Sequence, residues 1–600
     1  MTRVLNDPTT FASDHLRGFA RLHADLLTPV RGGVVRADRP PAGTVAVVTG
    51  GGSGHYPAFC GWVGPGMADG AVVGDVFASP SAEQIVHVAR AADSGGGILL
   101  VYGNYAGDVL NFTEALDRLT AEGRSVRQVA VTDDVTSADL AERDRRRGTA
   151  GDLVVLKVAG AAGAAGHDLD AVTALASRAN ARTTSFGIAF SGCTLPGADA
   201  PLFALPDGLM GVGMGVHGEP GIAEQPVATA TELARLLVRR LLDERPAGAG
   251  DRVVALLNGL GATKYEELFL LWGEVAALLE EAGLVLVAPE VGELITSLDM
   301  AGLSLTLCWL DPELEALWCA PATSPAFRRA GPGATAPAAP GAGRPPAAHP
   351  APDHAPGGPA GPPPAPVTAA GPEARAAARL VARAATEVHD ALVLAEADLG
   401  ALDAIAGDGD HGRGMTRGST AARDAVGRAV ARDAGPATVL REAGAAWADR
   451  SGGTSGALWG TALRAAAGAL PDDAAPTPTE VVAAVTAARD ALVRAGGAQV
   501  GDKTMLDAIE PFVVALTAAV ADGAPVRVAW ERAAADARSA ADATADLAPR
   551  RGRARPLAAR SLGHPDPGAM SAALLLTTLA GTGGAAGALG APVLDEGGAA

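Results

Sequence analysis

The sequence contains few cysteines, fewer cationic than anionic side chains, and no long uninterrupted apolar run. Four cysteines occur in 600 residues, and no two of them form a C-x-x-C pair. Their positions are Cys60, Cys193, Cys308 and Cys319. This scarcity argues against a zinc finger and against a scaffold held by disulfides. We therefore expect the protein to work in a reducing cytoplasm.

Positive charge is also in short supply. The chain carries 48 Lys and Arg against 67 Asp and Glu, which gives a formal net charge of -19. Such a surface repels phosphate backbones, so the composition predicts no nucleic-acid partner and no anionic membrane partner. Chemistry on small molecules is the favoured function class.

Apolar segments are too short for targeting or membrane insertion. The first residues include Asp7 and Asp14 and lack the apolar core of a signal peptide, so we expect no export. Residues 572–576 are apolar, but Thr577 and Gly581 interrupt the run before it reaches the roughly 20 residues of a membrane span. A buried helix is the expected structure there.

The length predicts several domains, and the composition shows where they divide. Residues 331–371 consist mainly of Ala, Pro and Gly, with almost nothing to form a core. This composition is typical of an extended, semi-rigid linker. We therefore divide the chain into a first domain at 1–330, a linker at 331–371 and a second domain at 372–600, and we expect motion between the domains.

The first domain has the sequence pattern of an α/β fold with two lobes. Residues 45–48 and 98–101 are β-branched runs that end in glycine-rich turns. Residues 253–257 and 284–287 are similar runs on either side of a helical pattern at 265–281, which indicates a second α/β lobe.

One helix of the first lobe has a recognisable start. Ser79 is a candidate N-cap and Pro80 would occupy the first helical position. Ile85, Val86 and Ala89 follow at helical spacing and are expected to form the buried stripe.

The second domain is predicted to be all-α. Residues 372–398 and 479–494 are long segments of Ala, Arg, Leu and Val with few β-branched clusters. Within the first domain, residues 152–158 fit either a strand or a helix.

The first candidate site is the sequence Gly-Gly-Gly-Ser-Gly-His at residues 50–55, directly after the strand predicted to end at Thr49. Four glycines allow the backbone to approach a ligand closely, although they would also suit a tight turn without chemistry. His55 favours the first interpretation, because an imidazole there could take a proton from a hydroxyl of a bound polyol or ketose.

A second loop follows the next predicted strand at residues 103–108. It places Asp108 beside two glycines, where ligands gather in open α/β sheets. Asp108 could orient His55 or share its acid-base role, or it could simply cap the following helix.

The third loop, residues 211–221, surrounds His217 with glycines. A lone histidine is most often structural. The glycines remove side-chain bulk around this one, however, so its neutral nitrogen could attack an electrophilic carbonyl.

The fourth motif, residues 403–412, contains Asp403, Asp408 and Asp410 within eight positions. Three neighbouring carboxylates raise each other's pKa unless a cation lies among them. Hard oxygen ligands suit Mg²⁺, which completes its shell with water and nucleotide phosphates. A solvated acidic loop is the alternative.

Two further loops carry groups that could bind the phosphates and the base of a nucleotide. Residues 451–456 offer amides and hydroxyls, and residues 563–568 form a turn rich in Pro and Gly, with Arg553 available as a cation. Residues 501–507 could be an ordinary helix start. All three also fit turns between helices.

Together and in this order, the motifs resemble the dihydroxyacetone kinase family in the form that fuses substrate-binding and nucleotide-binding domains. The resemblance implies a ketose site, an ATP donor and Mg²⁺, a cytoplasmic homodimer, and a place in glycerol metabolism. It also implies that the second domain is a barrel of eight antiparallel helices. The implied substrate-binding residues are Gly52, Ser53, Gly54, His55, Asp108 and His217.

The resemblance also assigns roles in catalysis. His217 would hold the ketose carbonyl as a hemiaminal, His55 with Asp108 would deprotonate a terminal hydroxyl, and Asp403, Asp408 and Asp410 would hold the metal. The implied nucleotide-binding residues are His411, Gly412, Arg413, Gly414, Thr454, Ser455, Gly496, Met505, Arg553, Asp566, Pro567 and Gly568.

Two departures bear on the substrate. The family commonly has Glu and Lys where this chain has Tyr56 and Gly103, so a tetrulose such as erythrulose is an alternative to dihydroxyacetone. Arg555 and Pro556 also replace a common Ser-Tyr pair. A phosphoenolpyruvate-dependent subunit and a non-catalytic ketose sensor are rivals, and the complete aspartate motif and the fused domains favour the kinase.

Overall fold

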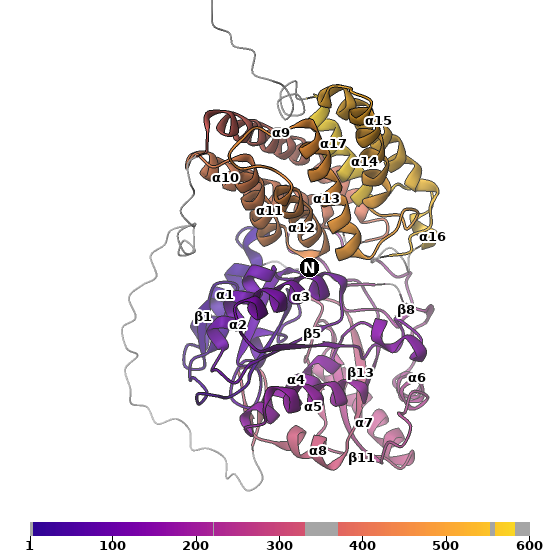
Figure 1. The fold of residues 1–600 in the computed structure, drawn as a ribbon. Helices are drawn as coiled ribbons and strands as arrows, with labels where there is room; N and C mark the ends of the chain where they lie inside the picture. The colour runs from indigo at the N-terminus through magenta and orange to yellow at the C-terminus, as the bar shows by residue number, and fades with distance from the viewer. Residues whose placement is uncertain (1–3, 220, 331–369, 408, 552–557, 582–600) are drawn as a thin grey trace, which may run out of the picture.

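The computed structural model describes residues 4–219, 221–330, 370–407, 409–551 and 558–581. An α/β part precedes residue 331, and a helical part begins near residue 370 and lies on top of it in Figure 1. This confirms the predicted α/β part followed by an all-α part, whereas the barrel of eight antiparallel helices stays a prediction. The predicted linker lies almost wholly outside the described residues.

The first sheet has six strands in the order β1-β2-β4-β3-β5-β6. Strands β4, β3, β5 and β6 pair in parallel, whereas β1 and β2 are antiparallel additions at one edge. The strand bounds are Leu27–Val30, Gly33–Arg36, Ala46–Ser53, Gly70–Val76, Ile98–Gly103 and Val126–Val131 for β1 to β6. The parallel strands bring the loops after β3, β5 and β6 to one edge.

The second sheet has seven strands and is mostly antiparallel. Its order is β11-β10-β13-β7-β8-β9, and β12 also pairs with β10. The bounds are Thr183–Ala189, Leu209–Val212, Ala223–Pro226, Arg252–Gly259, Val285–Leu286, Glu290–Gly292 and Gly302–Trp309 for β7 to β13. A short hairpin of β14 (Ala322–Thr323) and β15 (Arg328–Arg329) closes this part. The two predicted lobes are therefore two separate sheets.

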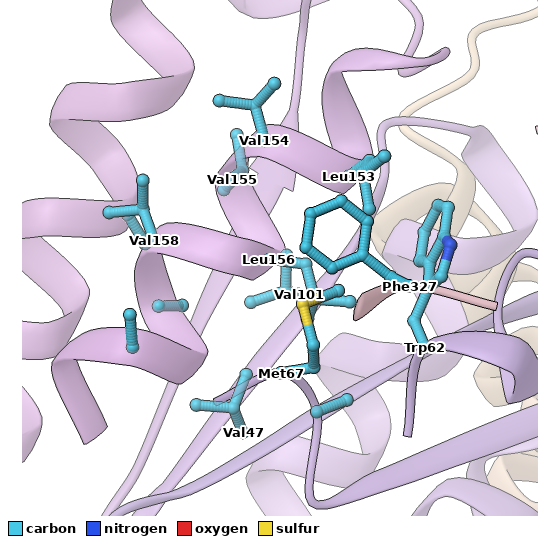
Figure 2. Close-up of a cluster of buried hydrophobic side chains, with 14 of the residues drawn as sticks. Val47, Trp62, Met67, Val101, Leu153, Val154, Val155, Leu156, Val158 and Phe327 are labelled. Atoms are coloured by element: carbon cyan, nitrogen blue, oxygen red, sulfur yellow. The ribbon is translucent and has the colours of Figure 1, made fainter. Parts of the chain in front are cut away.

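Helix α4 (Gly151–Ala164) packs between the two sheets. Residues 151–163 are all buried, and the apolar side chains of α4 meet Val47 and Val101 of the first sheet and Phe327 near the end of this part (Figure 2). The segment left open between strand and helix is thus a helix buried on every side. Other helices of this part are α1 (Phe11–Leu22), α2 (Ala82–Ala92), α3 (Ala106–Ala121), α5 (Leu169–Ala181), α6 (Ala230–Leu242), α7 (Tyr265–Glu281) and α8 (Pro312–Cys319).

The start of α2 differs from the prediction. Ser81, not Ser79, is the N-cap, because Ser81 Oγ accepts a hydrogen bond from the Gln84 amide while Gln84 reaches back to the Ser81 amide. This reciprocal capping box satisfies two helix-end donors, which Ser79 two residues earlier could not do. The predicted stripe is buried as expected.

The helical part forms a closed ring. Each long helix contacts the next one along the chain, and α17 returns to contact α9. The bounds are Pro372–Asp403, His411–Val430, Pro436–Ser451, Gly453–Gly468, Pro478–Gly496, Leu506–Ala521, Val526–Ala543, Ala558–Ser561 and Pro567–Gly581 for α9 to α17. No helix in the described parts of the chain combines the length and apolar character needed to cross a membrane.

The two parts meet along α2 and α3 on one side and α11 and α12 on the other (Figure 1). Asp449 accepts hydrogen bonds from Arg31 at 2.9 Å and from Ser81 Oγ at 2.8 Å. Arg464 pairs with Glu114 at 2.7 Å. The α2 cap and the helical part are therefore tied to one another within a single chain.

Candidate active site

His55 follows a strand that runs further than predicted. Strand β3 continues to Ser53, so the glycines at 50–52 belong to the strand rather than to a loop after Thr49. A Cβ on Gly52 would lie 2.8 Å from the amide nitrogen of Ala78, and Gly54 has a φ of 98°. Close packing and a left-handed turn both require glycine there, and together they fix where His55 emerges.

His55 and His217 face each other through their Nε2 atoms, which lie 3.0 Å apart. On the opposite side of each ring, His55 Nδ1 is 2.7 Å from the carbonyl oxygen of Thr296, and His217 Nδ1 is 3.0 Å from Glu219 Oε1. Both of those partners accept hydrogen bonds, so each Nδ1 carries its proton. A hydrogen bond between the two Nε2 atoms then requires one further proton, which the pair shares.

Glu219 anchors His217 at two points. Its Oε2 accepts the His217 amide proton at 2.9 Å while Oε1 accepts from the ring. Behind it, the Arg147 guanidinium lies 3.8 Å from Glu219 and 2.7 Å from Asp134. Burial lowers the pKa of Arg147, but the carboxylates of Asp134 and Glu219 outweigh burial and raise it. The imidazole is thus held by a buried, charged network.

Two aromatic rings enclose the histidine pair. Phe77 stacks on His55 with ring centroids 4.9 Å apart, and Tyr105 stands edge-on to His217 at 4.6 Å. Burial, followed by the nearby Glu219 carboxylate, raises the pKa of Tyr105 well above its usual value. Tyr105 is therefore a neutral wall of the site.

Asp108 lies in the first turn of α3, directly after the loop that follows β5. The sequence suggested Asp108 as a group that orients His55. In the structure, the carbonyl oxygen of Thr296 is the partner of His55 Nδ1, and a share for Asp108 in the acid-base role of His55 stays a prediction. Asp108 adds negative charge beside Tyr102, whose pKa is raised by burial and then by this carboxylate.

Sequence reasoning missed four residues of this site: Tyr105, Phe77, Glu219 and Thr296. Glu219 stands two positions after His217, inside the loop already singled out, so its carboxylate was a visible signal. Thr296 contributes a backbone oxygen, which no side-chain pattern could have revealed.

On the helical part, the predicted nucleotide residues cluster at helix starts. His411 begins α10; its Nε2 lies 2.9 Å from Ser571 Oγ of α17 and its Nδ1 lies 3.3 Å from Ser455 Oγ of α12. Ser451 Oγ donates to the carbonyl oxygen of Gly414 at 2.8 Å. Gly412 packs directly against the backbone of α9, where a Cβ would collide with the carbonyl group of Glu396. Three helices therefore converge at His411.

The loop at 563–568 joins the same region. Asp566 Oδ1 caps α17 by accepting the Ala569 amide proton at 2.7 Å, and Pro567 is the first residue of that helix. A Cβ on Gly568 would lie 3.6 Å from Met505 Cβ, so these two predicted residues are neighbours. Thr454 follows Gly453, Gly496 ends α13, and Arg553 lies outside the described residues.

Two of the three predicted metal ligands can be placed. Asp410 precedes α10, and burial followed by the charge of Asp403 raises its pKa to about 7, against a smaller lowering by Arg413. Asp408 lies outside the described residues, and the described part of the chain holds no group of three potential metal ligands. Mg²⁺ often uses only one or two protein carboxylates, so two half-buried carboxylates that repel each other fit it.

A cavity of about 260 Å³ lies between the two parts. The loop of His217 contributes Met214 and Gly218 to its wall, and the loop after Asp403 contributes Ala404 and Gly407. The predicted carbonyl-binding and metal-binding loops of one chain therefore face a common space.

Comparison with known proteins agrees with both halves of this site. The Dak1 domain matches residues 17–326, and the DAK2 domain matches residues 405–581. The chain belongs to the dihydroxyacetone kinase family. It is a kinase, since the relatives that match it over nearly their whole length are named as kinases.

Two of these relatives are close. A D-erythrulose kinase of Mycolicibacterium smegmatis is 53% identical over 97% of this chain and 98% of its own. An L-erythrulose kinase of Pectobacterium atrosepticum is 52% identical over 96% of this chain and 95% of its own. The family resemblance inferred from the motifs is thus confirmed.

A solved structure of the family supports the fold. The dihydroxyacetone kinase of C. freundii is 28% identical, covers 96% of this chain and 99% of its own, and has a TM-score of 0.51. The same enzyme has been solved in complex with AMP-PNP and Mg²⁺, with the same coverage and TM-score. ATP and Mg²⁺ are accordingly the cofactors of this family site.

Proposed function

We propose that this protein is an ATP-dependent kinase for a four-carbon ketose such as erythrulose. The imidazole pair of His55 and His217 is the observation that carries the ketose kinase chemistry. In support, the loop of His217 and the loop after Asp403 line one cavity. The names of the two close relatives favour a tetrulose over dihydroxyacetone, which the sequence alone had put first.

The residues of the chain can both hold the acceptor ketose and deprotonate its hydroxyl group. His217 Nε2 attacks the ketose carbonyl carbon, the C=O π electrons move to oxygen, and that oxygen takes the proton that the pair shares. His55 Nε2 then accepts the proton of the terminal hydroxyl as it attacks the γ-phosphate in line. Glu219 and Thr296 keep both rings aligned through these steps.

The residues around Asp403 and His411 can neutralise the negative charge of the ATP phosphates. Mg²⁺ held near Asp403 and Asp410 would offset the charge of the ATP phosphates. The start of α10 and the hydroxyls around His411 provide donors for phosphate oxygens. Cytoplasmic location and a homodimer stay predictions.

A coupled assay of ADP release tests the proposal. We expect turnover with D- or L-erythrulose to exceed that with dihydroxyacetone, and none with glycerol, because glycerol has no carbonyl for His217 to attack. Higher turnover with dihydroxyacetone would overturn the tetrulose assignment. The lack of ketose-dependent ADP release with any three- or four-carbon ketose would overturn the kinase proposal itself.

Two variants test the ketose-binding residues and the metal-binding residues independently. His217→Ala should lose most ketose affinity while ATP binding persists, and Asp410→Asn should lose turnover while ketose binding persists. Isothermal titration with each ligand measures both. Equal ketose binding by His217→Ala and the wild type would remove covalent capture from the mechanism.

A further inference from the structure

Phe77 contacts both imidazoles of the ketose site from a backbone conformation that phenylalanine rarely adopts. Its ring stacks on His55 with centroids 4.9 Å apart and stands edge-on to His217 at 5.2 Å. Its φ is 55°, in the left-handed region that residues other than glycine seldom occupy. Such a conformation persists only where the surrounding structure enforces it. The contacts around Phe77 therefore help to set the position of the imidazole pair.

Hydrogen bonds within the α/β part hold Phe77 on one side. We call residues 75–79, which include the end of β4, the Phe77 turn. The amide of Phe77 donates to the carbonyl oxygen of Ser53 at 3.0 Å, and the amide of Ala78 donates to the carbonyl oxygen of Asp75 at 3.1 Å. These bonds tie the turn to β3, but neither of them uses the side chain of Asp75.

The helical part contacts the Phe77 turn at both of its ends. The carboxylate of Asp75 pairs with the guanidinium of Arg417 on α10. The carbonyl oxygen of Ser79 accepts the amide proton of Gly453 at 3.2 Å. Arg417 also donates from Nη2 to the carbonyl oxygen of Ser451, the last residue of α11, at 3.4 Å. The side chains of Arg417 and Asp75 are only 28% and 27% exposed, so salt screens their ion pair less than a surface pair.

We infer that Arg417 is a positioning residue of the ketose site. Its ion pair with Asp75 fixes the Phe77 turn, and the Phe77 ring in turn keeps the two imidazoles aligned for the attack on the ketose carbonyl. This inference rests on the proposed function and adds a residue of the helical part to the half-site that binds the ketose. The ketose half-site is accordingly complete only when the helical part is docked on it.

Two substitutions remove the ion pair from opposite sides. Arg417→Gln removes the positive charge, and its amide can still donate to the carbonyl oxygen of Ser451. Asp75→Asn removes the negative charge and keeps an oxygen for the Val76 amide, which Asp75 Oδ1 accepts at 2.8 Å.

For both variants we expect weaker ketose binding by the full chain. The Kd for erythrulose, measured by isothermal titration without nucleotide, should rise about 5- to 20-fold, between the small effect of an exposed ion pair and the large effect of a buried one. The Kd for ATP with Mg²⁺ should stay within about threefold of that of the wild type, because the ion pair acts on the Phe77 turn.

Further variants test whether the two residues act as a pair. Asp75→Asn combined with Arg417→Gln should weaken ketose binding no more than either substitution alone, because both remove the same interaction. Arg417→Lys retains the positive charge and should retain most of the affinity. Thermal melts establish that each variant folds, and Asp75→Asn carries the test if Arg417→Gln does not.

Two matched controls lie on the helical part. Arg464→Gln removes another ion pair between the two parts, which Arg464 forms with Glu114 at 2.7 Å. Arg423→Gln alters an arginine of α10 that pairs with its neighbour Asp424. Neither of these ion pairs involves the Phe77 turn, so both variants should bind erythrulose as the wild type does.

The outcomes distinguish this inference from the function on which it rests. A wild-type protein that binds no ketose contradicts the proposed function. A wild type that binds erythrulose, together with an unchanged Kd in Arg417→Gln and Asp75→Asn, overturns the role of Arg417 and leaves the kinase intact. Equal weakening in Arg464→Gln also overturns it, because docking in general would then hold the site. A rise in the Kd for ATP alone would assign Arg417 to the nucleotide site instead.

Discussion

At the scale of single residues, the imidazole pair depends on charge as much as on geometry. Two rings whose Nδ1 protons are both committed to acceptors must share one more proton between their Nε2 atoms. That proton makes the pair cationic, and the buried Glu219 carboxylate is the anion that touches it. Behind Glu219, the positive charge of Arg147 and then the negative charge of Asp134 continue the series of opposite charges.

Replacing Glu219 should therefore weaken ketose capture without altering the nucleotide side. Glu219→Gln retains an oxygen that can accept the Nδ1 proton, but it removes the negative charge. A hydrogen bond to a charged group contributes about 1.5–3 kcal/mol, so we expect kcat/KM for the ketose to fall by about 10- to 100-fold. Steady-state kinetics with each substrate varied in turn measures this.

The KM for ATP is the internal reference for that experiment, and Glu266→Gln in the exposed first turn of α7 is the matched substitution. An equal rise in both KM values would show that Glu219 supports the fold rather than the imidazole.

Sequence alone singled out residues with a reactive side chain in an unusual glycine context. His55, Asp108 and His217 met that condition. Thr296 did not, because its contribution is a backbone carbonyl located 241 positions along the chain from His55. Residues 152–158 were singled out for no function, and they formed a segment that fitted either a strand or a helix.

At the scale of elements, α4 explains why that segment was ambiguous. Helical periodicity is visible when one face meets solvent, and α4 has no such face because it is packed between two sheets. By contrast, α7 has both buried and exposed faces, and its predicted bounds of 265–281 coincide with the observed helix. The cap of α2 was misplaced by two residues because two serines flank the same proline.

Burial of α4 gives Lys157 an unusual titration. Its side chain is fully buried, and Nζ donates to the carbonyl oxygen of Leu317 at 2.7 Å. Burial, followed by the charge of Arg329, lowers the pKa of Lys157 to about 7. In the unfolded chain this lysine keeps its proton until about pH 10.4. Between these values the unfolded state binds more protons, so stability rises with pH.

We predict that the free energy of unfolding of the wild type rises from pH 7 to pH 9 relative to that of Lys157→Met. The slope of this difference should approach, and not exceed, about 1.4 kcal/mol per pH unit. Urea titrations at several pH values measure it, with Lys264→Met, at the exposed start of α7, as control. Parallel stability curves for the wild type and Lys157→Met would show that Lys157 titrates normally.

At the scale of the whole molecule, the arrangement of the two parts could not be read from the sequence. The proline-rich segment predicted that two domains would meet, but it gave no information on where. The contacts that join them are single charged residues spread along the chain, such as Asp449 with Arg31 and Glu114 with Arg464. Their partners lie hundreds of positions apart, and each side chain alone has the pattern of an ordinary solvent-exposed charge.

These contacts place the acceptor and donor loops of one chain around the same cavity. The amide of Gly453 donates to the carbonyl oxygen of Ser79 at 3.2 Å, beside the start of the helix that carries Asp108. Phosphoryl transfer within a single chain is the arrangement that this docking favours. In a domain-exchanged dimer, by contrast, each ketose would meet the ATP of the partner.

A mixing experiment decides between the two arrangements. His217→Ala lacks the ketose half-site and Asp410→Asn lacks the donor half-site, so each is expected to be inactive alone. If transfer occurs within one chain, mixing them after joint unfolding and refolding should restore no ketose-dependent ADP release. Exchange between chains would restore about a quarter of the wild-type rate, because half of the randomly paired dimers would carry one intact site. Wild-type protein taken through the same refolding gives the reference rate, and recovery near a quarter of it would show that the docking seen within one chain is not the catalytic one.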